Sequence, residues 1–175
     1  MRSLLWILFI GLIQADANPL LLNQLAEGKL PANLKVIKVG PGALGKVRVT
    51  TENVPHPTTG VTEKQRVLEI TGGDAAASHY TLVFLNQPVY SNLSIFTRFR
   101  IVDGEGVRAA GVIFRMQPNQ KDYYLLAVKP ETKEAFWTVF QDGLPVKGFK
   151  YDEDQFISPK DGWQSIKLQA EENTS

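Results

Sequence analysis

The chain has 175 residues, a formal net charge of +1 and no cysteine. The balanced charge argues against nucleic acid and against an anionic membrane surface as partners, because both require a basic stripe. A chain without cysteine forms no disulfide, so apolar burial must supply its stability. Its length suffices for one domain with a sizeable core.

The first seventeen residues have the pattern of an export signal. Arg2 supplies a positive charge, residues 4–13 form a short apolar run, and Ala15-Asp16-Ala17 has the small-x-small pattern of a cleavage site. We therefore expect cleavage near Ala17, a mature domain over 18–175, and a periplasmic or extracellular location. The apolar run is too short to span a bilayer comfortably, and no membrane span is predicted.

Short apolar runs separated by turn residues follow in the mature chain and predict strands. The first strands are expected at 34–39, 46–50, 66–71, 79–85 and 90–102. Residues 40–45 are predicted to join the first two strands as a hairpin, and 51–65 to form a long polar loop. The segment 40–46 has the Gly-x-x-x-x-Gly-Lys spacing of a phosphate-binding loop. However, Val47 and a strand follow where that motif needs Ser or Thr and a helix.

The centre of the chain predicts a meander of three strands. They are expected at 110–116, 123–128 and 135–140. Both faces of each strand are apolar, with Val112, Phe114 and Met116 expected on one face of the first, so the meander should be covered on both sides. A hairpin tip is expected at 103–106 before it, and strands at 146–149 and 163–170 after it. Such a series of short strands and turns predicts an all-β antiparallel β-sandwich.

No catalytic or metal-binding motif is complete, and neither a catalytic residue nor a cofactor is assigned. His56 and His79 have no further metal ligand nearby in the sequence. Residues 152–154 are acidic but lack the glycine and spacing of a calcium loop, so a solvated loop is favoured and a structural calcium ion is the alternative. Glycoside hydrolysis needs a pair of carboxyl groups, and a pair drawn from two strands remains open. Within the meander, acids occur only at the turns: Asp122, Glu131 and Glu134.

A polar and aromatic set is embedded in the meander and in the strand before it. Aromatic faces and planar guanidinium groups suit the rings and hydroxyls of sugars. The candidate ligand-binding residues are Arg98, Arg115, Asp122, Tyr124 and Trp137. The alternative is that Tyr124 and Trp137 belong to the core, and that Arg98 and Arg115 are charges at its rim.

These motifs resemble those of the concanavalin A-like lectin/glucanase superfamily, in particular bacterial exported 3-keto-disaccharide hydrolase domains, which are family-16-like. The segments that carry the resemblance are Gly111-Val112-Ile113-Phe114-Arg115, Asp122-Tyr123-Tyr124 and Gly162-Trp163. The resemblance implies a concanavalin A-like jelly roll and a carbohydrate partner. The Glu-x-Asp-x-x-Glu strand of true family-16 glucanases does not occur in this sequence, so their retaining mechanism is not implied.

We expect an exported carbohydrate-binding or accessory module without chemistry of its own, acting alone or with neighbouring domains or secreted partners. The alternatives are a glycoside hydrolase-like enzyme acting on disaccharides or 3-keto-disaccharides, and a structural or adhesion module. The resemblance also implies further strands after 163–170. We therefore expect that the domain lacks its last strands and that an 18–175 protein aggregates through the open sheet edge.

Overall fold

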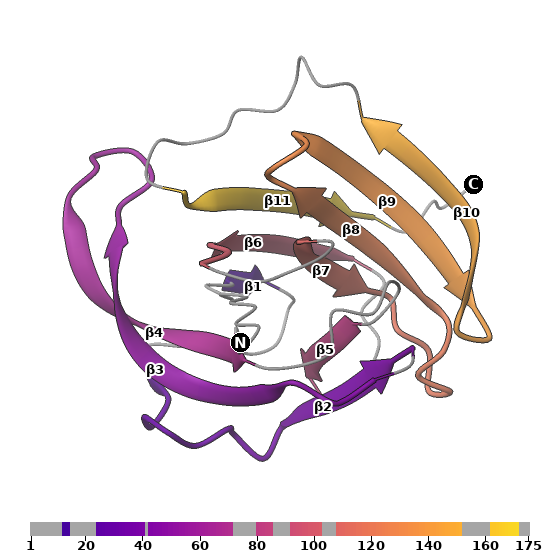
Figure 1. Cartoon of the computed structure of the whole chain (residues 1–175), viewed down its shortest axis with the longest axis horizontal. Coiled ribbons are helices and arrows are strands. Elements are labelled where there is room, and N and C mark those ends of the chain that lie inside the picture. The colour runs from indigo at the N-terminus through magenta and orange to yellow at the C-terminus, as the bar shows by residue number, and fades with distance from the viewer. Residues whose placement is uncertain are drawn as a thin grey trace.

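The computed structural model of the chain describes residues 12–14, 24–40, 42–71, 80–85, 92–102, 108–151 and 162–171 (Figure 1). In these ranges the chain forms antiparallel strands and no α-helix. The described residues therefore include no helix that is long and apolar enough to cross a membrane. The predicted all-β, antiparallel class is confirmed, and its layers are compatible with a β-sandwich.

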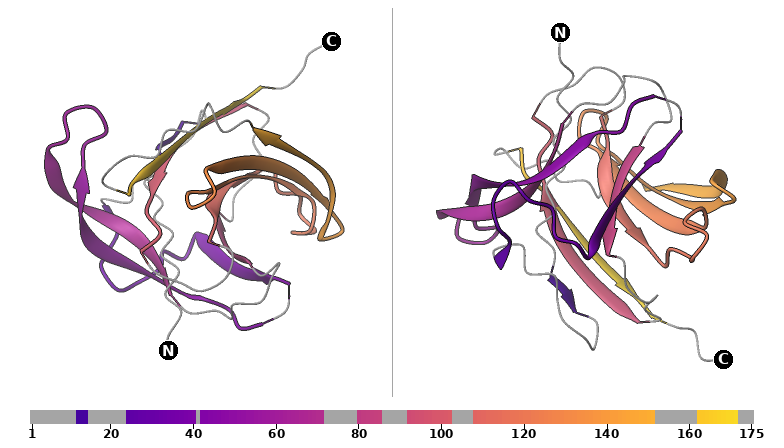
Figure 2. Two further views of the ribbon diagram at one scale, coloured as in Figure 1. Left: turned by 45° about the horizontal axis from the view of Figure 1, so that its top comes forward. Right: turned by 90° about the horizontal axis from the view of Figure 1, so that it is seen from below.

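The described strands form four antiparallel sheets, with the strand orders β1-β6-β11, β10-β9-β8-β7, β2-β5 and β3-β4. Their bounds are β1 Leu12–Gln14, β2 Leu34–Val39, β3 Lys46–Pro55, β4 Thr62–Thr71, β5 Tyr80–Leu85, β6 Leu93–Phe99, β7 Ala110–Phe114, β8 Tyr123–Lys129, β9 Glu134–Gln141, β10 Leu144–Tyr151 and β11 Gln164–Ala170. Several of these strands are strongly twisted and curved, as Figure 2 shows from two directions. The jelly-roll connectivity stays a prediction.

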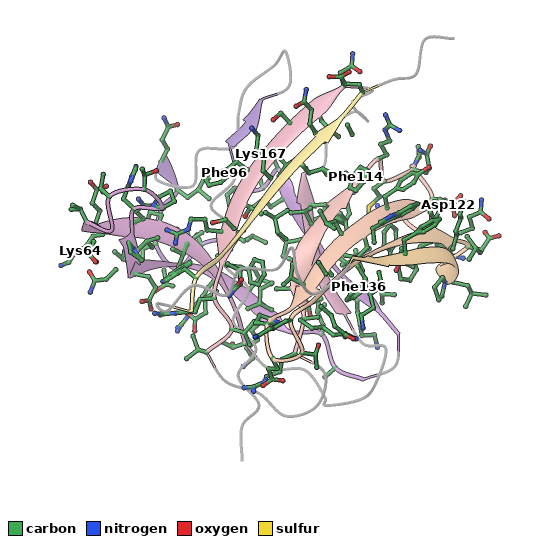
Figure 3. All side chains as sticks on the ribbon, turned by 90° about the horizontal axis from the view of Figure 1, so that it is seen from above. Lys64, Phe96, Phe114, Asp122, Phe136 and Lys167 are labelled. Atoms are coloured by element: carbon green, nitrogen blue, oxygen red, sulfur yellow. The ribbon has the colours of Figure 1, made fainter. Side chains whose placement is uncertain are left out.

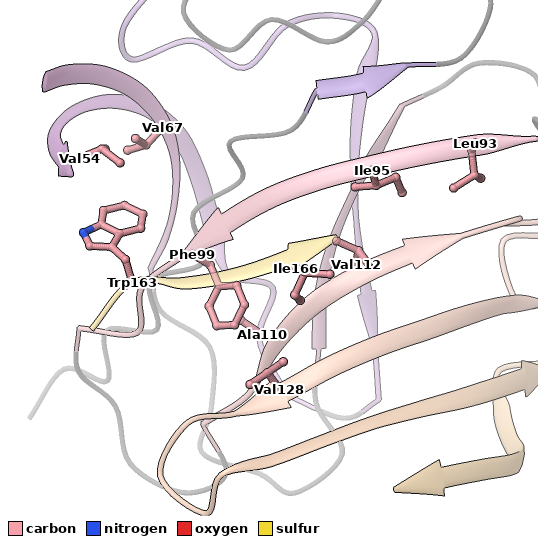
Figure 4. Packing of buried hydrophobic residues seen from close by; sticks show 10 residues of the cluster. All are labelled: Val54, Val67, Leu93, Ile95, Phe99, Ala110, Val112, Val128, Trp163 and Ile166. Carbon is pink, nitrogen blue, oxygen red and sulfur yellow. The ribbon is translucent and has the colours of Figure 1, made fainter. Parts of the chain in front are cut away.

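The predicted meander is present, and β10 extends it to four strands, which we call the meander sheet. One face of the sheet packs against β6 and β11, through a cluster that includes Val112, Val128, Phe99 and Ile166 (Figure 4). The other face packs against β2 and β5, through a cluster whose buried members include Leu125, Phe140 and Leu82. Both faces are thus covered over β7, β8 and part of β9, as the two-sided apolar pattern predicts, whereas the described side chains of β10 belong to neither cluster.

The predicted hairpin of 34–39 and 46–50 is wrong. β2 pairs with β5, whereas β3 pairs with β4 over the full length of both strands. The predicted polar loop at 51–65 is also wrong, because most of it extends these two strands. Its polar residues suit a two-stranded ribbon that faces water on much of its surface. The actual turn is short, and His56 Nδ1 accepts hydrogen bonds from the backbone N–H groups of Thr58 and Thr59, each 3.3 Å long.

The side-chain alternation of β7 stops at Arg115. This residue has a positive φ of 52°, which breaks the extended backbone. Met116 therefore packs in the cluster of Ile113 and not on the face of Phe114. The prediction that Met116 lies on the same face as Phe114 is therefore wrong. It assumed an extended backbone with strict alternation of side chains, which the left-handed Arg115 interrupts.

Several sequence-based assignments fall outside the described residues. These are the 103–106 hairpin tip, His79, the acidic run at 152–154 and most of the export signal. Of the signal, only Leu12–Gln14 is described, and it pairs with Ser94–Phe96 of β6. Export therefore stays a prediction.

Candidate functional site

Four aromatic side chains form a continuous row across the meander sheet, one from each strand. They are Phe114 of β7, Tyr124 of β8, Trp137 of β9 and Phe149 of β10. The ring centroids of successive residues are 5.2, 6.4 and 4.7 Å apart. We call this set the aromatic row; it contains two of the residues predicted from the sequence, Tyr124 and Trp137.

Strand register builds the aromatic row. Phe114 lies opposite Tyr124, and Trp137 opposite Phe149. Tyr124 lies opposite Val139, so its contact with Trp137 is a diagonal one between neighbouring strands. The first two residues come from hairpin partners close in sequence, whereas Phe149 is added by the fourth strand.

A β-bulge brings Phe149 to the row. The register of β10 against β9 shifts between Pro145 and Lys147, with Val146 as the extra residue. If Val146 were paired in regular register and the bulge were absent, Phe149 would lie opposite Phe136 and point to the other face of the sheet. Sequence reasoning predicted a strand at 146–149 but missed Phe149 as a member of the site. The available signal was Pro145, since proline inside a strand is confined to edges and bulges.

Two of the three successive ring pairs in the aromatic row are stacked, and the middle pair, Tyr124 and Trp137, is tilted by 30°. Phe114 and Tyr124 have ring planes 23° apart, and Trp137 and Phe149 have planes 20° apart. At these short centroid distances the rings are offset-stacked and not side by side in one plane. Phe114, Tyr124 and Trp137 are half-buried, while Phe149 is 47% exposed. The row thus presents a partly exposed apolar ridge, with most open surface at Phe149.

Cationic and polar groups border this ridge. Lys147 Nζ lies 5.0 Å from the ring centroid of Phe149, within cation–π range. Arg115 follows Phe114 directly and donates a 2.8 Å hydrogen bond from Nη2 to the carbonyl of Glu171. Asp122 Oδ1 accepts a 2.7 Å hydrogen bond from the backbone N–H of Asp142, which ties the start of β8 to the β9–β10 turn. The predicted residues Arg115 and Asp122 are thus sequence neighbours of row members.

Arg98 is not part of this site, and its alternative reading as a rim charge is wrong. It is only 5% exposed, and its guanidinium donates to the carbonyl of Pro55 at the end of β3. The guanidinium carbon of Arg98 lies 5.5 Å from the ring centroid of Trp163, and that of Arg100 lies 5.1 Å from it. Trp163 itself is buried in the core (Figure 4). Arg98 therefore links β6 to the β3–β4 ribbon, a structural role that its sequence position does not reveal.

The three acids at the turns of the meander are held by other groups. Glu131 pairs with Arg108, and Glu134 pairs with Lys129 and Lys150. These two acids belong to the β8–β9 turn, whereas Asp122 precedes the other end of β8. Seven strand residues separate those ends, a span of roughly 20 Å. That is far beyond the approximately 5–9.5 Å required between the two carboxyl groups of a glycosidase.

The environment of Glu134 favours its charged form. Hydrogen bonds from Lys150, Thr132 and Lys129, together with the positive charge of Lys150, lower its pKa from 4.5 to about 2. A carboxyl group in this state is a poor general acid near neutral pH, because it holds no proton to donate. Across the described residues, no group of three or more His, Asp or Glu side chains could hold a metal ion.

One buried acid was missed by sequence reasoning. Glu69 of β4 is 1% exposed and accepts hydrogen bonds of 2.5 and 2.9 Å from Nε and Nη2 of Arg48, its cross-strand neighbour. This bidentate pair neutralises Glu69 within the β3–β4 ribbon.

Comparison of the chain with protein-family models, with curated proteins and with solved structures found no match.

Proposed function

We propose that the protein binds carbohydrate through the aromatic row and does not transform it chemically. The observation that carries this proposal is the row itself: four adjoining aromatic residues, with Phe149 open to solvent and Lys147 beside its ring. Such an apolar ridge bordered by a few polar groups suits the C–H faces and hydroxyls of a sugar. The resemblance of the meander motifs to the concanavalin A-like superfamily supports the same class of ligand.

The row runs across the strands, so a bound glycan would lie across the meander sheet. Four strands span about 14 Å in this direction. A ligand that contacts the whole row is therefore an oligosaccharide and not a single sugar. Neighbouring rings cover part of one another's faces, so the glycan contacts the exposed ring edges and the open side of Phe149. Lys147 lies near the Phe149 ring, and its side chain moves away when the glycan binds.

The state of the carboxyl groups supports binding over hydrolysis. Asp122 is held by the β9–β10 turn, and Glu131 and Glu134 are held by cations at the far end of β8. A hydrolase acting on disaccharides or 3-keto-disaccharides would have to draw a carboxylate pair from elsewhere in the chain. A structural or adhesion role would leave the exposed part of the aromatic row without a ligand.

The test is a glycan-array screen followed by calorimetric titration with the soluble form of any oligosaccharide retained. Trp137→Ala and Phe149→Ala should each weaken binding about tenfold or more, as expected for aromatic residues that dominate a contact. Phe96→Ala is the matched control, because Phe96 is a 36% exposed phenylalanine on β6, opposite Lys167 (Figure 3). Binding to no glycan, or equal binding by all three variants, would overturn the proposal.

A further inference from the structure

Strand β10 forms one edge of the meander sheet and carries an unusual amount of exposed apolar surface. Among the described strands it pairs with β9 alone. Leu144 is 66% exposed, Val146 is 54% exposed and Phe149 is 47% exposed. Soluble proteins normally shorten, charge or cover such edges, because the open backbone groups of an apolar edge recruit another strand.

The geometry of β10 restricts where another strand could pair. Pro145 has no N–H group, and the bulge at Val146 interrupts the ladder. The remaining straight part is Lys147–Tyr151, which is in regular register with β9. Phe149 is the central residue of this straight segment.

We propose that the straight segment of β10 pairs antiparallel with the same segment of a second copy of this chain, about a two-fold axis at Phe149. In this register Phe149 lies opposite Phe149 of the other copy, Lys147 opposite Tyr151, and Gly148 opposite Lys150. The contact is self-complementary, as a two-fold dimer requires. It does not rest on the proposed glycan binding.

The positions of the lysines exclude two of the alternative registers. Two antiparallel strands related by a two-fold axis place the same face of the sheet on the same side, so only registers centred on a residue are allowed. Centring on Lys147 or Lys150 would place identical charges opposite each other, which is destabilising. Centring on Phe149 places no lysine opposite a lysine, and each Lys150 already pairs with Glu134 of its own chain.

The aromatic row identifies the partner as a second copy. Its last ring, Phe149, is stacked on Trp137, lies within cation–π distance of Lys147 and is still 47% exposed. In the dimer the second Phe149 takes up the next cross-strand position, at the spacing that already separates the members of the row. Two aromatic rows then join across one continuous eight-stranded sheet, and each Phe149 gains a second aromatic cross-strand neighbour.

Sedimentation equilibrium of the full chain, without glycan, tests the pairing. The wild-type protein should form dimers. Phe149→Lys places two lysines opposite each other and should raise the dimer dissociation constant at least tenfold, while Phe96→Lys on β6 should not change it. A protein that stays monomeric, or a dimer that Phe149→Lys leaves intact, would overturn the proposal; the second result would assign the contact to another surface, such as the β11 edge.

Disulfide trapping tests the register itself, and the absence of native cysteine makes it unambiguous. A mixture of Lys147→Cys and Tyr151→Cys proteins should oxidise to a covalent heterodimer, because directly opposite residues are within disulfide range. Either variant alone should not cross-link, since its own copies lie four residues out of register. Cross-linking of either single variant, or none in the mixture, contradicts the Phe149-centred register even if the protein is dimeric.

Discussion

Trp137 on β9 and Phe149 on β10 stack with ring centroids 4.7 Å apart and ring planes 20° apart. This contact depends on the Val146 bulge, which turns Phe149 to the face of Trp137. A stacked pair of this kind is worth about 0.5–1.5 kcal/mol beyond the area that it buries. The contact thus links the sheet edge to the half-buried part of the aromatic row.

A double-mutant cycle tests this coupling. Trp137→Ala, Phe149→Ala and the double variant should show an interaction free energy of about 0.5–1.5 kcal/mol in urea unfolding. The effects of Trp137→Ala and Phe96→Ala on the free energy of unfolding should be additive, because Phe96 lies on β6, in another sheet. Additive effects of Trp137→Ala and Phe149→Ala would contradict the stacking.

Arg98→Ala should destabilise the protein without changing ligand affinity. The substitution removes a buried guanidinium that contacts Pro55 and Trp163, so the free energy of unfolding should fall by about 2–4 kcal/mol. Lys64→Ala, at an exposed position at the opposite end of the molecule from Asp122 (Figure 3), should change it by about 0.5 kcal/mol or less. A stable Arg98→Ala protein that loses glycan binding would instead return Arg98 to the ligand site.

The Arg48–Glu69 pair predicts non-additive effects on stability. Arg48→Leu leaves the buried carboxylate of Glu69 unpaired and should lower the free energy of unfolding, by less than the loss of a fully buried partner would because Arg48 is itself exposed. Glu69→Leu in the same chain should recover much of this loss. Equal destabilisation in the single and double variants, measured by urea unfolding, would show that the carboxylate does not depend on Arg48.

Glu134 predicts a specific loss of stability in acid. Its folded-state pKa of about 2 lies below its ordinary value of 4.5, so its stabilising contribution is complete above pH 4.5 and disappears as the pH falls towards 2. Glu134→Gln should therefore be less stable than the wild type at pH 7 and should lose less stability between pH 4.5 and 2. Lys150→Met should have a similar effect, but little further effect in the Glu134→Gln background. Parallel stability–pH curves for wild type and Glu134→Gln would contradict the assignment.

Local sequence patterns predicted the strands of the meander well. β7, β8 and β9 match the expected segments to within two residues at each end. Runs of aromatic and β-branched residues bounded by Pro, Asn and Asp strongly favour a strand over other secondary structure. In β11, Ile166, Leu168 and Ala170 alternate along the strand and all pack in or against the core cluster. Period-two alternation suffices where the backbone stays extended.

Pairing and positive-φ residues could not be predicted in the same way. Whether β2 joins β3 or β5 depends on contacts between distant segments, which the residues of 40–45 do not encode. The left-handed Arg115 and the Val146 bulge each shift the alternation by one residue, and they decide the faces of Met116 and Phe149. Tyr124 and Trp137 could be proposed from residue type alone, whereas the row that contains them required the register.

The most direct test of the aromatic row as the ligand-binding face is to follow the indole N–H resonances by ¹⁵N NMR while the retained oligosaccharide is added. Trp137 belongs to the row, whereas Trp163 is 2% exposed in the core. We expect a saturable shift of the Trp137 resonance while that of Trp163 stays in place. A shift of Trp163 alone, or saturable binding that leaves Trp137 unmoved, would contradict it.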